Sequence, residues 1–256
     1  MPDIFSSTQR YFLSLKYNGA GYAGFQVQEN AQTIQGEVEK ALNIYTKKKI
    51  VLTGSSRTDA GVHAQCNFFH FDFDGELTDK HLYHLNAILP AAISLERIWK
   101  VHPTAHCRFD AIGREYAYHI YAQKDPFLDG RAWFYPYPMD LDALNEAARS
   151  ILGKHDFTSF AKKKSQVKTH MCEISHCLWK KEGGHLIFEV KGNRFLRGMV
   201  RGLVGTMVKV GRGKMSIYEF ENVLLSKDNT MADFAAPACG LYLQNVTYGG
   251  LLKANS

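Results

Sequence analysis

Residues 50–73 read IVLTGSSRTDAGVHAQCNFFHFDF, and this stretch indicates the kind of sheet that the chain forms. Ile50–Thr53 and Ala64–Phe73 are rich in β-branched, aromatic and other apolar residues, which is typical of strands. They are separated by Gly54–Gly61, a loop rich in Gly, Ser and Asp. Because the two strands follow each other without a helix, the stretch favours antiparallel pairing over a regular parallel βαβ arrangement.

The rest of the chain continues this irregular order of helices and strands. Apolar residues recur at spacings of three and four after Thr33, so a helix is expected to begin there. Ser216 and Glu219 form a capping box, which predicts the start of the last helix. The other expected elements are strands at Tyr11–Tyr17, Glu115–Tyr121, Ile174–Trp179, Leu186–Val190 and Tyr242–Tyr248, and helices that begin at Thr78, Asp140 and Phe195.

The order is strand-helix-strand-strand-helix twice over, and it lacks the regular alternation of a doubly wound parallel sheet. We therefore predict an α+β fold, in which two similar halves share a largely antiparallel mixed sheet backed by helices. The continuity of the pattern is weakest near residues 101–111. The expected domains are an N-terminal half, residues 1–105, and a C-terminal half, residues 106–256.

Composition limits the class of protein. The chain has 256 residues, of which 45% are hydrophobic and 22% charged, as in ordinary globular proteins. No apolar run approaches the ~18 residues of a membrane span, and Met1–Ser7 lacks the features of a secretion signal. Five scattered cysteines, an odd number, favour reduced thiols over a disulfide framework. We expect a cytoplasmic protein with no membrane partner.

The distribution of charge permits a polyanionic partner. The net charge is +6, and basic runs occur at Lys47–Lys49, at Lys162–Lys164 with Lys168, and between Arg194 and Lys214. Each run alone is typical of a solvated face. Three runs together with 13 tyrosines that can stack on bases favour RNA binding.

The loop Gly54–Gly61 is the first candidate for chemistry. Asp59 lies two residues from Arg57 and two from Gly61. A neighbouring guanidinium favours the ionised carboxylate and can fix its direction. A glycine lets the backbone fold tightly, so that the carboxylate can point into a cleft. From local features alone, a plain turn whose Asp bonds its own backbone fits the loop at least as well.

The segment Phe195–Gly205 is the second candidate. Every fourth residue from Phe195 is apolar and belongs to the core of an expected helix, whereas Arg197 and Arg201 form a separate stripe one turn apart. The expected helix contains glycines, each of which costs about 1 kcal/mol relative to alanine, so close packing must require them. Arg197 could therefore point into a buried polar site, with Asp59 as a candidate counter-ion; the alternative is an arginine stripe in solvent.

A further group of residues only resembles a metal site. His170, Cys172, His176 and Cys177 have ligand-like spacing but lie in an expected strand. Residues 172 and 177 would then face opposite sides, which a tetrahedral site does not tolerate without a bulge. Signatures of dinucleotide and P-loop sites are also missing from the sequence. We expect no nucleotide, flavin or metal cofactor.

Several motifs, in order along the chain, resemble those of one family. Arg57–Ala64, RTDAGVHA, resembles the signature of the TruA-type tRNA pseudouridine synthases. Segments that resemble the other motifs of this family are Lys16–Gly19 with Tyr22–Gln26, His106–Ala111 with Arg114–Tyr118, Gly153–Phe160, Asn193–Gly205 and Gly240–Leu243. The resemblance covers residues from about 11 to 248, and it reverses the preference for a plain turn at Asp59.

The resemblance implies isomerisation of uridine to pseudouridine at positions 38, 39 and 40 of the tRNA anticodon stem-loop, with the target base flipped out. It also implies two pseudo-symmetric α+β halves with a basic cleft between them, and a homodimer. By motif, Asp59 is implied as the catalytic nucleophile or base, and Arg57 as its flanking arginine. Tyr116 is implied as the active-site tyrosine, and Arg197 as the basic partner of the aspartate. The residues expected to bind RNA are Arg57, Arg114, Tyr116, Lys162, Lys163, Lys164, Lys168, Arg194 and Arg201.

Two other functions remain as alternatives. The first is a catalytically silent RNA-binding module on the same scaffold. The Arg57-Thr58-Asp59 loop argues against it, because binding alone does not need a carboxylate paired with a cation. The second is a hydrolase that uses Asp59 on small nucleosides, in which the basic runs would have no role.

Overall fold

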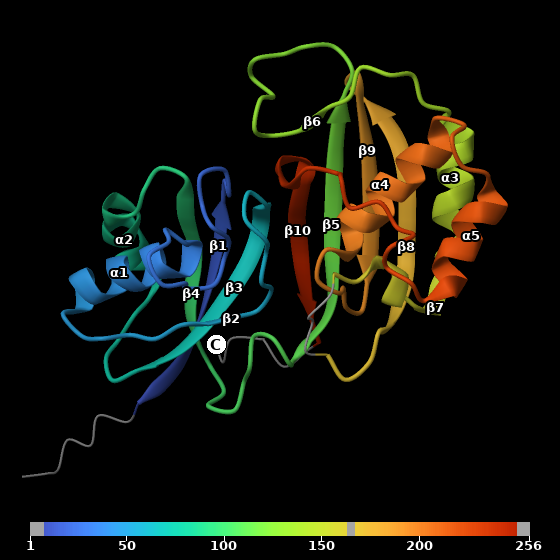
Figure 1. Cartoon of the computed structure of the whole chain (residues 1–256). Helices are drawn as coiled ribbons and strands as arrows, with labels where there is room; N and C mark the ends of the chain where they lie inside the picture. Colours follow the sequence, from blue (N-terminus) through green and yellow to red (C-terminus); the bar gives the residue numbers. More distant parts are fainter. Residues whose placement is uncertain (1–7, 163–166, 250–256) are drawn as a thin grey trace, which may run out of the picture. The chain divides into compact units, whose positions relative to one another are not determined.

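The structure, a computed structural model, describes residues 8–162 and 167–249. The described residues form two compact units (Figure 1). The first contains the residues up to Ile112 and those from Asn245 onward, and the second contains Gly113–Gln244. The chain therefore returns to the first unit within its last strand. The division into domains 1–105 and 106–256 stays a prediction.

The first unit is built on antiparallel strands. The central strand β1 (Gln9–Tyr17) pairs with β3 (His63–Phe73) on one side and with β4 (Ile93–Val101) on the other. The short β2 (Thr53–Gly54) pairs with β3, and the strand order continues from β3 to β10 (Leu241–Tyr248). The helices of this unit are α1 (Ile34–Thr46) and α2 (Leu82–Ile88), which contact each other.

Local sequence signals explain α1 well. The Thr33 side chain accepts a hydrogen bond from the amide of Gly36, which satisfies one of the unpaired donors at the helix start. The expected apolar face is buried, and its buried members are Ile34, Val38, Ala41 and Leu42. The predicted start of this helix is confirmed.

The second unit also combines strands with helices. Its strand order runs from β10 to β5 (Ala111–Tyr121), β9 (His185–Gly192), β8 (Met171–Glu182) and β7 (Gly153–Asp156). The short β6 (Trp133–Phe134) pairs with β5 in parallel. The helices α3 (Leu141–Ser150), α4 (Met199–Gly211) and α5 (Ile217–Ser226) pack together, and α3 also contacts β8 (Figure 1).

These elements confirm the predicted α+β class. The pairings β1–β3, β1–β4 and β2–β3 in the first unit and β5–β9, β8–β9 and β7–β8 in the second are antiparallel. The Ser216–Glu219 capping box at the start of α5 is also present. The strand β4 was missed, because charged residues interrupt its apolar pattern.

Two general expectations about the chain can be compared with the structure. None of the five cysteines, all of which lie in the described ranges, forms a disulfide. This agrees with the expectation of reduced thiols. Among the described residues, no helix combines the length and the hydropathy that a membrane span requires.

Candidate active site

A buried hydrogen-bond network supports the loop that carries Asp59. Tyr17 Oη and Thr58 Oγ1 share a hydrogen bond of 2.8 Å. The Asn67 amide nitrogen donates both to Tyr17 Oη, at 3.2 Å, and to the Ser56 carbonyl, at 2.8 Å. Asn67 is fully buried, and such groups stabilise one geometry because leaving any of them unpaired is costly. The network therefore fixes the backbone on the N-terminal side of Asp59.

The segment after β1 lies against the same loop. The Phe25 amide donates to the Thr58 carbonyl at 3.1 Å. Gly24 has φ +111°, and a Cβ there would lie 3.1 Å from the Thr58 oxygen and 3.3 Å from the Ala60 nitrogen. Gly19 lies even closer to the loop, because a Cβ on it would collide with the Val62 carbonyl. Glycine is required at both positions, because the backbone of the Asp59 loop occupies the space of a side chain.

The loop itself closes in a tight turn. The Val62 amide donates to the Asp59 carbonyl at 3.2 Å, and Gly61 has φ +77°. This positive φ is the conformation for which Gly61 was expected, since it favours glycine at the third position of such a turn. The Asp59 side chain is half-buried and that of Arg57 is exposed. The loop therefore contains a backbone turn that begins at Asp59.

Gly24→Ala is expected to lower the rate of the reaction by about 100-fold, because a displacement of about 1 Å in a catalytic group has an effect of this size. The added Cβ must push against Thr58 and Ala60, on either side of Asp59. Gly21→Ala is the matched control, because Gly21 also has positive φ, +83°, but no atom lies within 4 Å of its added Cβ. The measurement is the rate of product formation by the two variants, compared at equal folded fraction. Equal losses in both variants would contradict the role of Gly24 in positioning.

The candidate residues of the second unit gather where β5 faces the loop after β9. Tyr116 lies on β5, and its ring meets the edge of Phe195 at a centroid distance of 5.0 Å. Arg114, two residues earlier, donates through Nη1 to the Asn193 carbonyl at 3.1 Å. The Asn193 amide in turn donates to the Glu173 carbonyl of β8. Arg114 thus ties β5 to the loop that leads to Arg197.

The structure corrects the expected placement of Arg197. Helix α4 begins at Met199, not at Phe195, so Arg197 precedes the helix and is exposed. The reason is Gly198, whose φ of +75° is incompatible with a helix interior. The Arg197 carbonyl accepts a hydrogen bond from the Lys162 amide at 2.9 Å, and a Cβ on Gly198 would lie 2.8 Å from Lys162 Cγ. This glycine therefore lets the backbones carrying two basic residues approach each other.

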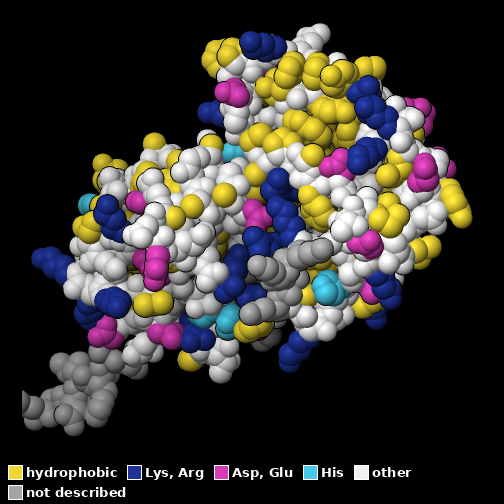
Figure 2. Space-filling view, in the orientation of Figure 1, with side chains coloured by type: hydrophobic (Ala, Val, Ile, Leu, Met, Phe, Trp, Pro, Cys, Tyr) yellow, Lys and Arg dark blue, Asp and Glu magenta, His cyan; other side chains and the backbone are white. Residues whose placement is uncertain are grey.

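The other expected RNA-binding residues have different surroundings. Arg201 lies in α4 and is half-buried, and its Nε donates to the Ala236 carbonyl at 2.7 Å. Arg194 is half-buried in the loop after β9, and Lys168 is exposed. Lys163 and Lys164 lie outside the described residues. Figure 2 shows groups of Lys and Arg side chains on the face in view, where the acidic side chains are more scattered.

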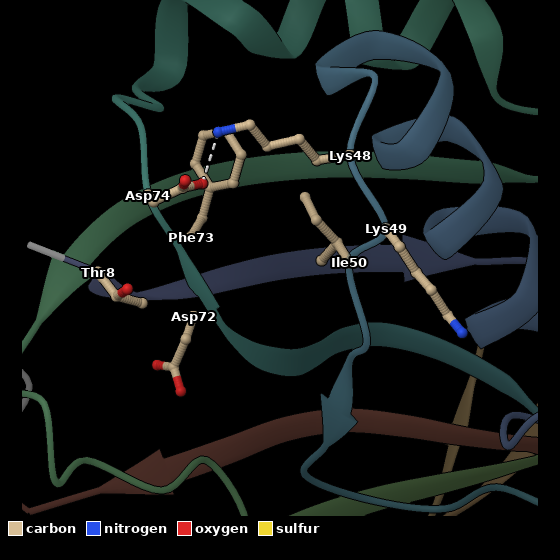
Figure 3. Close-up of a pocket in the computed structure, with 7 residues that line it drawn as sticks. All are labelled: Thr8, Lys48, Lys49, Ile50, Asp72, Phe73 and Asp74. Carbon is tan, nitrogen blue, oxygen red and sulfur yellow. Dashed lines mark hydrogen bonds and ion pairs between the residues drawn. The ribbon is translucent and has the colours of Figure 1, made fainter. Parts of the chain in front are cut away.

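The basic run Lys47–Lys49 is partly neutralised. Lys48 Nζ lies 2.7 Å from an Asp74 oxygen and over the Phe73 ring, as Figure 3 shows. These residues line a pocket of about 290 Å³ that also contains Asp72. Two carboxylates among its lining groups oppose binding of a polyanion. The surface at this run therefore has mixed charge.

Cys172 and Cys177 lie on the same face of β8, and the prediction that they face opposite sides was wrong. The pairing of β8 with β9 shifts register between Ile174 and His176, and both cysteines are buried. A bulge adds one residue and so brings the two side chains to the same face of the strand. The Cys177 thiol donates to the Ala148 carbonyl at 2.8 Å, and burial raises its pKa to about 12.

A different cluster has ligand types that could hold a metal ion. The ligand atoms of His70, His106 and Cys107 lie within 4.8 Å of one another. His70 Nδ1 is 3.2 Å from the Cys107 sulfur, and the thiol is 3.1 Å from the Thr53 carbonyl. Burial, with the nearby His106 and Arg10, lowers the pKa of His70 to about 4. The hydrogen bonds within the cluster are sufficient to explain why these side chains lie close together. No sequence pattern indicated the cluster.

The residues that support the Asp59 loop were not predicted from the sequence. Asn67 lies in β3 among aromatic side chains, where a polar residue is unexpected unless it is hydrogen-bonded. That position was the only signal, and it did not identify Tyr17 and Thr58 as partners. Arg57 and Asp59 belong to the first unit, and Tyr116, Arg197 and Lys162 belong to the second.

Comparison with known proteins identifies the family to which this chain belongs. A family model described as tRNA pseudouridine synthase matches residues 147–249. A tRNA pseudouridine synthase A of Parabacteroides distasonis is 41% identical over 242 residues, which cover 94% of this chain and 96% of that protein. The chain belongs to the TruA-type tRNA pseudouridine synthases. This is a family of isomerases, and the resemblance seen in the motifs is confirmed.

Other relatives are similar over the same length. The tRNA pseudouridine synthase A of Bacteroides fragilis is 42% identical over 245 residues, 94% of this chain and 97% of that protein. The synthase of Staphylococcus aureus strain MRSA252 is 37% identical over 240 residues, 93% of this chain and 91% of that protein. The similarity of this synthase to these relatives therefore extends over nearly the whole length of each chain, and the Asp59 loop and its supporting network lie within it.

Proposed function

We propose that this synthase isomerises uridine to pseudouridine at positions 38, 39 and 40 of the tRNA anticodon stem-loop. The observation that carries the proposal is the buried network of Tyr17, Thr58 and Asn67 beneath Asp59, in a loop with the family's signature. A surface loop without a function in positioning would not need such support. The near full-length similarity to proteins named tRNA pseudouridine synthase A supports tRNA as the substrate.

The reaction requires no net oxidation and adds no atoms. The C1′–N1 bond breaks, the uracil turns, and a C5–C1′ bond forms, while the C5 proton leaves and N1 gains a proton. A carboxylate at Asp59 can assist as a nucleophile towards the sugar or the base, or as the base that removes the C2′ proton. Tyr116 would stack on the uracil and take the C5 proton, and Arg197 would act as the basic partner of Asp59.

Binding of the substrate makes separate demands. The target base must leave its stack, which costs a few kcal/mol and must be offset by stacking and phosphate contacts. Arg57, Arg114, Lys162, Arg194 and Lys168 are proposed to supply phosphate contacts, together with Lys163, Lys164 and Arg201. A homodimer in the cytoplasm, with a basic cleft in each protomer, completes the proposal. The chemistry needs no cofactor.

Mapping of pseudouridine in bulk tRNA tests the proposed positions. Cells that lack the gene are expected to lose pseudouridine at positions 38–40, and the gene on a plasmid is expected to restore it. The gene with Asp59→Asn should not restore it, which separates catalysis from simple RNA binding. Unchanged modification at these positions in the deletion strain would contradict the proposed sites. Restoration by Asp59→Asn would show that the modification does not need the Asp59 carboxylate and would contradict its catalytic role.

A further inference from the structure

A pocket of about 260 Å³ lies in the first unit beside the Asp59 loop. Its lining includes Arg57, Arg108, His106 and Phe109, and none of its lining residues is acidic. The lining thus has two arginines and no acidic residue, a composition that favours an anion with several oxygens, such as a phosphate. This pocket therefore differs in charge from the one around Lys48, which contains Asp72 and Asp74.

Phe109 is an unusual member of this pocket because 75% of its surface is exposed. One side of its ring meets His106 at a centroid distance of 4.2 Å, and the Arg108 guanidinium lies 5.9 Å from its centroid. Unlike other exposed aromatic side chains, such as Phe127, this ring lines a pocket beside two arginines, where a ligand can cover its apolar surface. Aromatic rings of this kind are platforms on which unpaired nucleobases stack.

The backbone holds this ring in a defined place. His106 Nδ1 accepts hydrogen bonds from the amides of Arg108, at 3.2 Å, and Phe109, at 3.3 Å. The His106 amide donates to an Asp110 carboxylate oxygen at 2.7 Å, and the Asp110 amide donates to the His106 carbonyl at 3.0 Å. The turn is thus preorganised by four hydrogen bonds, which reduces the entropy cost of binding.

Arg57 connects the pocket to the candidate catalytic residue. It lies two residues before Asp59 in the same loop, so their Cα atoms are separated by at most about 7 Å. A ligand in the pocket would therefore lie close to a substrate engaged by Asp59. The distance fits a neighbouring nucleotide of the same RNA strand better than an unrelated small molecule.

We propose that this pocket binds a nucleotide of the tRNA adjacent to the reacting uridine, with its base stacked on Phe109 and its phosphate held by Arg57 and Arg108. This inference rests on the proposed function, and it adds a subsite that holds the RNA strand next to the target uridine. The stacking ring accepts any base, whereas the arginines supply binding that depends on salt.

Exchange of the ring tests the stacking contact. Phe109→Leu is expected to raise the Kd for an unmodified tRNA transcript by about 5- to 100-fold, the range for loss of one stacked base. Phe109→Trp should bind within about 2-fold of wild type, since it keeps the aromatic face. Phe127→Leu is the matched control, because Phe127 is 82% exposed and does not line the pocket. Equal Kd values for wild type and Phe109→Leu would overturn the proposal.

The arginine contact has a separate measurement. Arg108→Ala is expected to reduce the slope of log Kd against log salt by about 0.7 to 0.9, the effect of losing one phosphate contact. Arg97→Ala is the control, because Arg97 is an exposed arginine of the same unit whose guanidinium lies over Trp99, outside the pocket. An unchanged slope for Arg108→Ala would contradict the phosphate contact.

A crosslinking experiment tests the position of the ring directly. Benzoylphenylalanine at position 109 is expected to form a photo-crosslink to the tRNA transcript near position 38, 39 or 40, whereas the same group at 127 should not. A crosslink that maps to another part of the tRNA, or only to a second protein chain, would overturn the proposal. Failure of the proposed function is distinguishable, since the wild-type enzyme would then form no pseudouridine while Phe109 still contributed to RNA binding.

Discussion

Asp59→Asn is expected to bind an unmodified tRNA transcript with the wild-type Kd and to lose at least about 1,000-fold in pseudouridine formation. Asparagine has the shape of aspartate but carries no charge, so it cannot act as nucleophile or base. The support of the loop should survive, because Tyr17, Thr58 and Asn67 contact the backbone and side chains around Asp59 and are unchanged. Tritium release from tRNA labelled at uridine C5 measures the product.

Asp74→Asn is the control for this substitution. Asp74 also lies in the first unit and pairs with a lysine, Lys48, but it is exposed and far along the chain from the loop. Exposed ion pairs contribute about 0–1 kcal/mol, so this variant should turn over normally. Appreciable tritium release by Asp59→Asn would count against Asp59 as the reacting group. Loss of tRNA binding by this variant would instead indicate a role in holding RNA.

Arg197→Ala is expected to lose at least about 100-fold in kcat while its Kd for tRNA changes by less than about 5-fold. The proposed reason is the loss of the cation that stabilises the negative charge on Asp59 and the developing charge during the reaction. A simple phosphate contact would produce the opposite pattern, with weaker binding and nearly normal kcat. The ratio of the two effects therefore identifies the role of the guanidinium.

Added guanidinium ion provides a second measurement on this variant. If the missing charge causes the loss, guanidinium should restore part of the turnover of Arg197→Ala and should not affect Arg149→Ala. Arg149 is a suitable control, because it is an exposed arginine in the last turn of α3, in the same unit. Near-normal turnover of Arg197→Ala without additive would refute the pairing with Asp59.

Arg197 lies in the loop immediately before α4. Gly198 ends the loop with φ +75°, and its missing side chain leaves room for the stem of Lys162. The Lys162 amide also bonds to the Arg197 carbonyl. The sequence indicated a helical stripe of Arg197 and Arg201, whereas the structure separates them. Arg197 stays exposed, and Arg201 holds the Ala236 carbonyl.

The sequence by itself determined the elements that depend on neighbouring residues. Helix α1 after Thr33 and helix α5 after Ser216 were predicted at the right place, because capping and apolar spacing act within one or two turns. The α+β class followed from the order of strands and helices, and the family followed from motifs that include the Asp59 loop. Each of these signals is contained in a short, contiguous segment.

The tertiary structure alone decided what depends on residues far apart in the sequence. The bulge in β8 that turns Cys172 and Cys177 to one face arises from pairing with β9. The Tyr17–Asn67 contact joins residues 50 positions apart, and the pocket joins Arg57 to Phe109. Such contacts form only when the chain packs, because no local pattern brings these groups together. Their favourable free energy arises once packing has excluded water from around them. The support beneath Asp59 and the exposed ring beside it are consequences of that packing.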